Sequence, residues 1–128
     1  MIKKEIEEYI RLCDKFEDEC YRVCKILSES KKRCFSNDIT YAENFTIEDN
    51  NVVIWEGTER WNYGGEKWHN GMFPLSYLTM TDDELRKIVE KENLEWDKEQ
   101  EEQKEKNEEF AKKLRKKQYE LLKKEFEK

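Results

Sequence analysis

The feature that most constrains this chain is an apolar stripe that repeats at alternating intervals of four and three residues. No glycine or proline interrupts residues 2–34. Such spacing places every member on one face of an α-helix and is typical of a helix that packs along another helix. We therefore expect one long, coiled-coil-like helix within residues 1–36. The members of this seam are Ile2, Ile6, Tyr9, Cys13, Phe16, Cys20, Val23 and Leu27.

The composition indicates that the helix is covered by a second copy of the chain. Charged residues make up 44% of the 128 residues and hydrophobic residues 36%, whereas ordinary globular domains have about 25% and 45–50%. Long charged helices gain burial by pairing, so we expect a homo-oligomer. The predicted interface combines the seam with a second stripe near the C-terminus: Ile6, Tyr9, Cys13, Phe16, Cys20, Val23, Leu27, Phe110, Leu114 and Leu121.

The hydrophobic period changes to two after residue 36, which predicts strands. A turn at residues 49–51 (Asp-Asn-Asn) predicts a hairpin. Its register pairs Ile47 with Val53, Phe45 with Trp55, and Ile39 with Trp61, which places Trp55 and Trp61 in the core of the sheet. Two glycines at positions 64 and 65 turn the chain again, and residues 66–73 return as a third strand. We expect an antiparallel meander within residues 37–80.

A capping sequence marks the start of the last helix: Thr81 caps it, Glu84 closes the box, and Met80 packs against Leu85. Residues 97–109 contain 3 Lys/Arg, 7 Asp/Glu and no apolar side chain, whereas residues 111–128 contain 8 Lys/Arg and 3 Asp/Glu. We expect a long charged helix over residues 81–128, with an exposed bridge at 97–109 and a second apolar stripe at 110–126. The fold class expected is mainly α, with an α+β arrangement.

The sequence contains no nucleophile–base pair, phosphate-binding loop, dinucleotide fingerprint or metal-ligand motif. Its four cysteines are separated by 7, 4 and 10 positions and form no Cys-x-x-Cys pair, so they fit reduced thiols in a cytosolic protein. We therefore expect no catalytic residue, no metal and no cofactor. No apolar run approaches the roughly 20 residues of a membrane span, and the N-terminus does not resemble a signal peptide, so no membrane partner is expected.

Residues 55–74 concentrate the aromatic residues, all four glycines and the single histidine and proline. Trp, Tyr and Arg dominate the binding energy of protein interfaces. One interpretation is that these aromatics only cover one face of a thin sheet; the other is that some of them bind a partner. Trp68 and His69 fit strand alternation less well, so we expect both to be exposed. The predicted ligand- or partner-binding residues are Arg60, Tyr63, Lys67, Trp68, His69 and Phe73.

One run of the sequence covers under a fifth of the chain. It consists of an aromatic–glycine segment, then Phe73-Pro74 and Tyr77-Leu78, and a helix start at residues 81–85 (Thr-Asp-Asp-Glu-Leu). This run resembles small uncharacterised accessory proteins of phages and prophages of Gram-positive bacteria. The resemblance implies a non-enzymatic phage-type protein in the bacterial host cytoplasm that inhibits an antiviral defence system by binding a host protein.

Two alternatives to this expectation remain. One is a sponge that holds a small signalling nucleotide between subunits through aromatic and arginine side chains, since flat aromatic rings stack on bases. The other is a structural or nucleic-acid adaptor that uses the basic C-terminal helix. The basic segment also fits a solvated face that balances the acidic segment before it, so nucleic acid is the less favoured partner.

Overall fold

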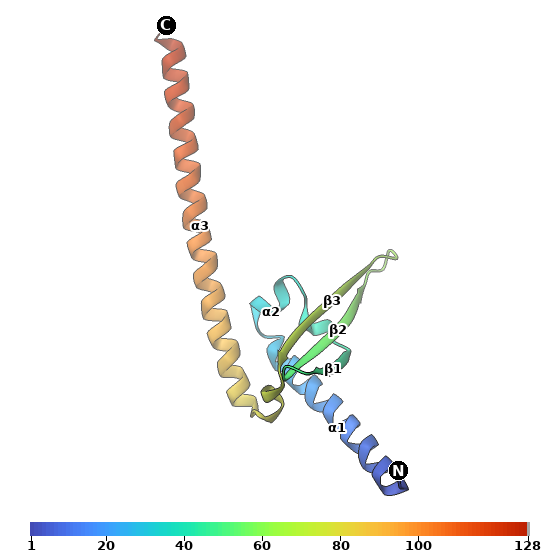
Figure 1. Cartoon of the computed structure of the whole chain (residues 1–128). Helices are drawn as coiled ribbons and strands as arrows, with labels where there is room; N and C mark the ends of the chain where they lie inside the picture. Colours follow the sequence, from blue (N-terminus) through green and yellow to red (C-terminus); the bar gives the residue numbers. More distant parts are fainter. Residues whose placement is uncertain (128) are drawn as a thin grey trace. The chain divides into compact units, whose positions relative to one another are not determined.

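The computed structural model describes residues 1–127 and has an α+β fold (Figure 1). It contains a long N-terminal helix, a three-stranded antiparallel sheet and a long C-terminal helix, which confirms the expected fold class. The chain forms two units, Met1–Asn93 and Leu94–Lys128, and the division falls within the last helix. The elements are α1 (Lys3–Leu27), α2 (Lys31–Phe35), the 3-10 helix η1 (Ile39–Tyr41), β1 (Asn44–Glu48), β2 (Val52–Arg60), β3 (Glu66–Pro74), the 3-10 helix η2 (Leu75–Thr79) and α3 (Asp82–Phe126).

The first helix ends earlier than the sequence predicted. A single helix was expected through residue 34, but α1 ends at Leu27 and a short turn separates it from α2. In this turn the Ser28 hydroxyl donates to the Lys25 carbonyl at 2.5 Å, and the Ser30 amide donates to the Leu27 carbonyl at 3.0 Å. Serine hydroxyls compete with the helical backbone for its carbonyls. The prediction of one uninterrupted helix is therefore wrong beyond Leu27.

The hydrophobic core lies between the second half of α1 and one face of the sheet, and the first turns of α3 complete it. Val53, Trp55 and Phe73 come from the sheet, and Leu85 and Val89 come from α3. The full set of buried apolar residues is Cys20, Val23, Cys24, Ile26, Leu27, Ile39, Ala42, Val53, Trp55, Phe73, Leu85 and Val89.

The seam on α1 is divided between this core and solvent. Cys20, Val23 and Leu27 are fully buried within their own chain, so the prediction that they contact a second subunit is wrong. Ile6, Tyr9 and Cys13 are exposed, and Phe16 is half-buried. The spacing predicted correctly which face of α1 is apolar. The second half of that face is buried within the same chain, largely by the sheet.

The sheet has the order β1-β2-β3 with both pairs antiparallel. Phe45 pairs with Trp55 and Ile47 with Val53, as the sequence predicted, and the third strand ends at Pro74. The predicted pairing of Ile39 with Trp61 is wrong. Ile39 lies in η1, whose first turn is capped by the Asp38 carboxylate accepting from the Thr40 amide at 3.0 Å, and β1 begins only at Asn44.

Two arginines join α1 and α2 to the region where α3 begins. The Arg22 guanidinium lies 2.6 Å from an Asp82 carboxylate oxygen and donates to the carbonyls of Leu78 and Met80. The Arg33 guanidinium lies 2.7 Å from Glu92, which also accepts from the Ser30 hydroxyl at 2.7 Å. These contacts fix the first turns of α3 over the core.

The second unit consists of the remainder of α3. Its side chains at Phe110, Leu114 and Leu121 are exposed, as is nearly all of the helix from residue 97 onward. The predicted bridge at residues 97–109 is helical and exposed. Among the described residues, no helix is both long and apolar enough to cross a membrane.

Candidate binding surface on the β2–β3 hairpin

The β2–β3 hairpin extends beyond β1 (Figure 1). β1 pairs only with Val52–Glu56, whereas β3 pairs with the whole of β2. Beyond Glu56 the inner face of the hairpin packs on η1 instead. At Gly57 an added Cβ would lie 1.7 Å from the Tyr41 carbonyl oxygen, so only glycine allows this approach. The base of the hairpin is therefore fixed to the body of the first unit.

His69 makes several of the contacts that hold the base of the hairpin in place. Its side chain is 3% exposed, its Nδ1 accepts from the Asp38 amide at 2.9 Å, and its Nε2 lies 2.8 Å from Glu59 Oε2. Its ring stacks on Tyr41 with a centroid separation of 5.2 Å. Because Nδ1 accepts, Nε2 carries the proton and donates to Glu59. The predicted exposure of His69 is therefore wrong, and the ring instead holds the segment before β1 against the hairpin.

The carboxylates beside His69 are stabilised in their ionised form. The hydrogen bond from His69 lowers the pKa of Glu59 against a smaller effect of burial, and Tyr41 and Trp61 act in the same direction. Burial would raise the pKa of Asp38, but hydrogen bonds from the hydroxyl and amide of Thr40 outweigh it and lower that pKa. This cluster is a structural clamp, because both ring nitrogens of His69 are already occupied.

The thiol next to this clamp is not activated. Burial, together with the negative charge of Asp38, raises the pKa of Cys34 to about 11, and its sulfur lies 3.2 Å from the Ser28 carbonyl. A thiol with a raised pKa is a poor nucleophile near neutral pH. Among residues 1–127, no group of three or more His, Cys, Asp or Glu side chains is placed to hold a metal ion.

The turn at the end of the hairpin depends on two glycines. The Gly64 amide donates to the Trp61 carbonyl at 3.1 Å, and Gly64 has a φ of +86°, which glycine adopts without strain. The Trp61 ring lies over Gly65, where an added Cβ would be 2.3 Å from a ring carbon. The Trp61 side chain is 50% exposed, so its predicted place in the core is wrong, whereas Trp55 is buried as predicted.

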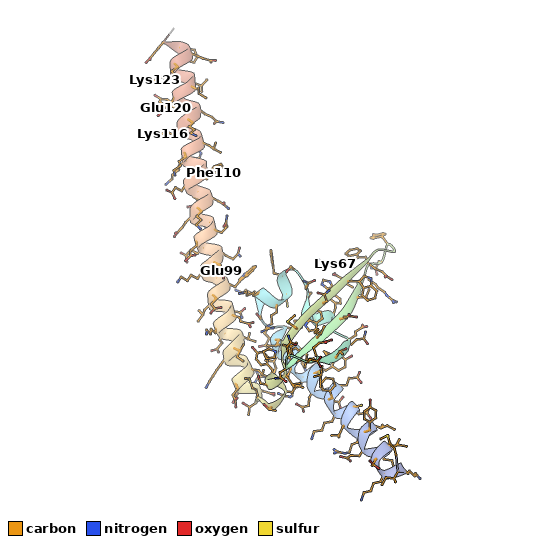
Figure 2. All side chains as sticks on the ribbon, in the orientation of Figure 1. Lys67, Glu99, Phe110, Lys116, Glu120 and Lys123 are labelled. Carbon is orange, nitrogen blue, oxygen red and sulfur yellow. The ribbon has the colours of Figure 1, made fainter. Side chains whose placement is uncertain are left out.

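Beyond its base, the hairpin presents large aromatic side chains and two cations to solvent. Tyr63 is fully exposed and Trp68 is 66% exposed. Arg60 lies 3.7 Å from Glu66 across the strands, and Lys67 lies near the free end of the hairpin (Figure 2). We call this set the hairpin tip: Arg60, Trp61, Tyr63, Lys67 and Trp68.

Trp68 lies on the outer face of the sheet, opposite Thr58, and Met72 follows on the same face opposite Ile54. The Met72 side chain is also exposed. Asn70, paired with Glu56, lies between them on this face, so Trp68 and Met72 are two separate exposed apolar side chains. Alternation along β3 explains why the neighbouring residues point the other way, with His69 and Phe73 on the inner face.

The structure thus brings together four of the six predicted binding residues. Arg60, Tyr63, Lys67 and Trp68 lie in the hairpin tip, but Lys67 is on the inner face and donates to the Ser36 carbonyl at 3.5 Å, whereas Trp68 is on the outer face. Phe73 is 1% exposed and belongs to the core, so its predicted binding role is wrong, as is that of His69. The prediction missed Trp61 and Met72. Strict period-two alternation through residues 68–73 would have placed His69 and Phe73 on one face and Trp68 and Met72 on the other.

A second exposed apolar surface lies between α1 and β1. It is a groove of about 510 Å³ whose walls include Tyr9, Leu12, Phe16 and Phe45. Glu17 and Glu43 also line it. It has three aromatic side chains, as the hairpin tip does, but Phe16 and Phe45 are half-buried against the core.

No family model, curated protein or solved structure matches this chain. The exposed chemistry of its own residues is therefore the basis on which a function is inferred.

Proposed function

We propose that this chain is a non-enzymatic binding protein that engages a protein partner through the hairpin tip. The observation that carries the proposal is the exposure of three large aromatic side chains, Trp61, Tyr63 and Trp68, at the end of a hairpin whose base is fixed. Aromatic side chains and arginine provide most of the binding energy in protein interfaces.

The shape of this surface favours a macromolecule over a small ligand. A small-molecule site surrounds its ligand and buries about 70–90% of the ligand surface. Tyr63 is fully exposed and Trp68 is two-thirds exposed, so the tip offers a convex surface with no surrounding wall. A protein partner with a complementary concave pocket covers such a tip. This is the reason to place protein binding ahead of nucleotide binding.

The charges near the tip suggest the chemistry of the partner. Residues 35–96 carry 5 Lys/Arg and 13 Asp/Glu, yet two of those five cations, Arg60 and Lys67, are in the tip. Complementary charge at the rim of an interface speeds association and selects partners. Glu66 lies 3.7 Å from Arg60 in the same turn region, so we infer a partner pocket that is apolar at its centre and carries polar groups of both charges at its rim.

The resemblance of residues 64–85 to accessory proteins of phages and prophages supports a biological setting for this proposal. In that setting the partner is a host protein of an antiviral defence system, the chain inhibits it, and the site of action is the bacterial cytoplasm. The hairpin would act by occupying a pocket of the target.

The test uses capture from bacterial lysate, followed by affinity measurement with the purified captured protein. We expect Trp68→Ala and Tyr63→Ala each to weaken the affinity at least about tenfold, because hot-spot truncations cost more than about 1.4 kcal/mol. Tyr119→Ala is the matched control, because it removes an aromatic side chain from α3 that is as exposed as Trp68. Thermal melting should be unchanged in all three variants, since none of these side chains is in the core.

Three results would contradict the proposal. The first is that the Trp68→Ala and Tyr63→Ala variants bind the captured protein with the same affinity as the wild-type chain. The second is a nucleotide released on denaturation and identified by mass spectrometry, which would favour the sponge. The third is a salt-dependent mobility shift with DNA or RNA that requires the basic helix, which would favour the adaptor.

A further inference from the structure

The face of α3 that packs on the core continues along the rest of the helix. At 3.6 residues per turn, eleven positions between residues 85 and 121 fall within an arc of roughly 80°. Leu85 and Val89 are buried, and Glu92 is the partly buried partner of Arg33. We call this set the α3 face: Leu85, Val89, Glu92, Trp96, Gln100, Gln103, Asn107, Phe110, Leu114, Gln118 and Leu121.

The charged stretch at residues 97–109 leaves the α3 face uncharged. Ten of its thirteen residues are charged, and the three exceptions are Gln100, Gln103 and Asn107. All three lie on the α3 face, where Gln103 donates to the Asn107 side chain at 3.1 Å. In a helix that is solvated on all sides, charged residues are expected on every face, including this one. The pattern indicates a face that makes contact.

We propose that the α3 face beyond residue 96 is covered by the same segment of a second copy, running antiparallel, with the two-fold axis between Phe110 and Ala111. Charge complementarity selects this arrangement. Residues 97–109 carry 3 Lys/Arg and 7 Asp/Glu, whereas residues 112–124 carry 7 Lys/Arg and 1 Glu. The antiparallel pair places each acidic segment against the basic segment of the other copy. Glu99 and Lys116 lie on either side of Phe110 along the helix (Figure 2).

The contacts on the α3 face suit this register. Across the axis, Gln103 of one copy meets Gln118 of the other, and Asn107 meets Leu114. Paired side-chain amides satisfy each other's hydrogen bonds, and buried amides at seam positions fix orientation and register at some cost in stability. Phe110 lies beside the small side chain of Ala111 in the other copy, so a large residue faces a small one at the centre.

Two other arrangements of the same helices are less favourable. A parallel pair puts acidic segments against acidic segments and basic against basic. An antiparallel pair centred between Lys117 and Gln118 packs Leu114 against Leu121, but it brings the basic segments of both copies together, with 7 Lys/Arg in each. The register centred near Ala111 keeps Phe110 and Leu114 at the interface and avoids this repulsion.

Disulfide trapping distinguishes the three arrangements. The experiment uses the full chain with Cys13→Ser, because Cys13 is the exposed native cysteine. We expect Ala111→Cys to cross-link to itself under mild oxidation and Gln118→Cys not to do so. Cross-linking of Gln118→Cys alone would overturn the proposed register, cross-linking of both would indicate a parallel pair, and cross-linking of neither would overturn the pairing.

Sedimentation measures the strength of the pair independently. Leu114→Ala should raise the dimer dissociation constant at least about tenfold, because the side chain is lost twice in a symmetric pair. Tyr119→Ala lies on the opposite side of the helix and should leave the constant unchanged. Raising the salt concentration should weaken the wild-type dimer. A monomeric wild-type chain, or equal effects of the two substitutions, would refute the proposal without bearing on the hairpin tip.

Discussion

The two halves of the α1 seam have the same spacing and opposite environments. Cys20, Val23 and Leu27 are buried against the sheet, whereas Ile6 and Tyr9 are exposed. Nothing in the intervals between these residues distinguishes the halves. The difference arises because the sheet and the start of α3 bury only the second half. The spacing of a seam therefore identifies the apolar face of a helix. The position of the rest of the chain decides which part of that face is buried.

The largest difference between the halves should appear in thiol reactivity. Burial raises the pKa of Cys20 and of Cys24 from the ordinary thiol value to about 12. A rise of about three units lowers the thiolate fraction roughly a thousandfold near pH 8. Cys13 in the exposed half should therefore be alkylated first, as followed by mass spectrometry over time. Equal labelling of Cys13 and Cys20 in the native protein would contradict this assignment of burial.

Truncation of one apolar side chain in each half gives the next largest difference. Leu27→Ala should lower the free energy of unfolding by about 2–5 kcal/mol, because Leu27 is fully buried and its loss leaves a cavity. Ile6→Ala should change it by less than about 0.5 kcal/mol in a monomer. Urea unfolding at low protein concentration measures both. A large effect of Ile6→Ala that grows with protein concentration would show that a second copy covers the exposed half.

The smallest difference concerns one arginine in each half. Arg22 pairs with Asp82 and donates to two carbonyls before α3, whereas Arg11 pairs only with Glu8 on the exposed surface of α1. Arg22→Met should cost about 1–2 kcal/mol of unfolding free energy because charged hydrogen bonds to the backbone are lost. Arg11→Met should cost less than about 0.5 kcal/mol. Indistinguishable midpoints for the two variants would show that Arg22 does not stabilise the start of α3.

The sequence alone determined much of the architecture because local chemistry specifies it. The pairing of Phe45 with Trp55 follows from the turn at residues 49–51, and the start of α3 follows from Thr81 and Glu84. The end of α1 was harder to predict from the sequence. Residues 28–30 contain no helix breaker, and the turn there is held by Glu92, which is about sixty residues away in the chain.

The candidate site was predictable in part for the same reason. The glycines at 64 and 65 marked the hairpin end, so Tyr63 and Trp68 were placed correctly near it. Trp61 was assigned to the core because period-two alternation places it on the same face as Trp55. The sequence does not show that η1 covers this face only at the base of the hairpin. His69 was misplaced because its hydrogen-bond partners, Asp38 and Glu59, come from different segments of the chain.

The clamp around His69 has a consequence for the conditions under which the protein acts. Histidine is the side chain whose charge ordinarily changes between about pH 5 and pH 8, and this chain has one. That residue is enclosed at the base of the hairpin with both ring nitrogens engaged. The hairpin tip contains no histidine, so its recognition chemistry lacks the usual means of responding to physiological acidification. None of the five side chains of the tip ordinarily changes its charge between about pH 5 and pH 8.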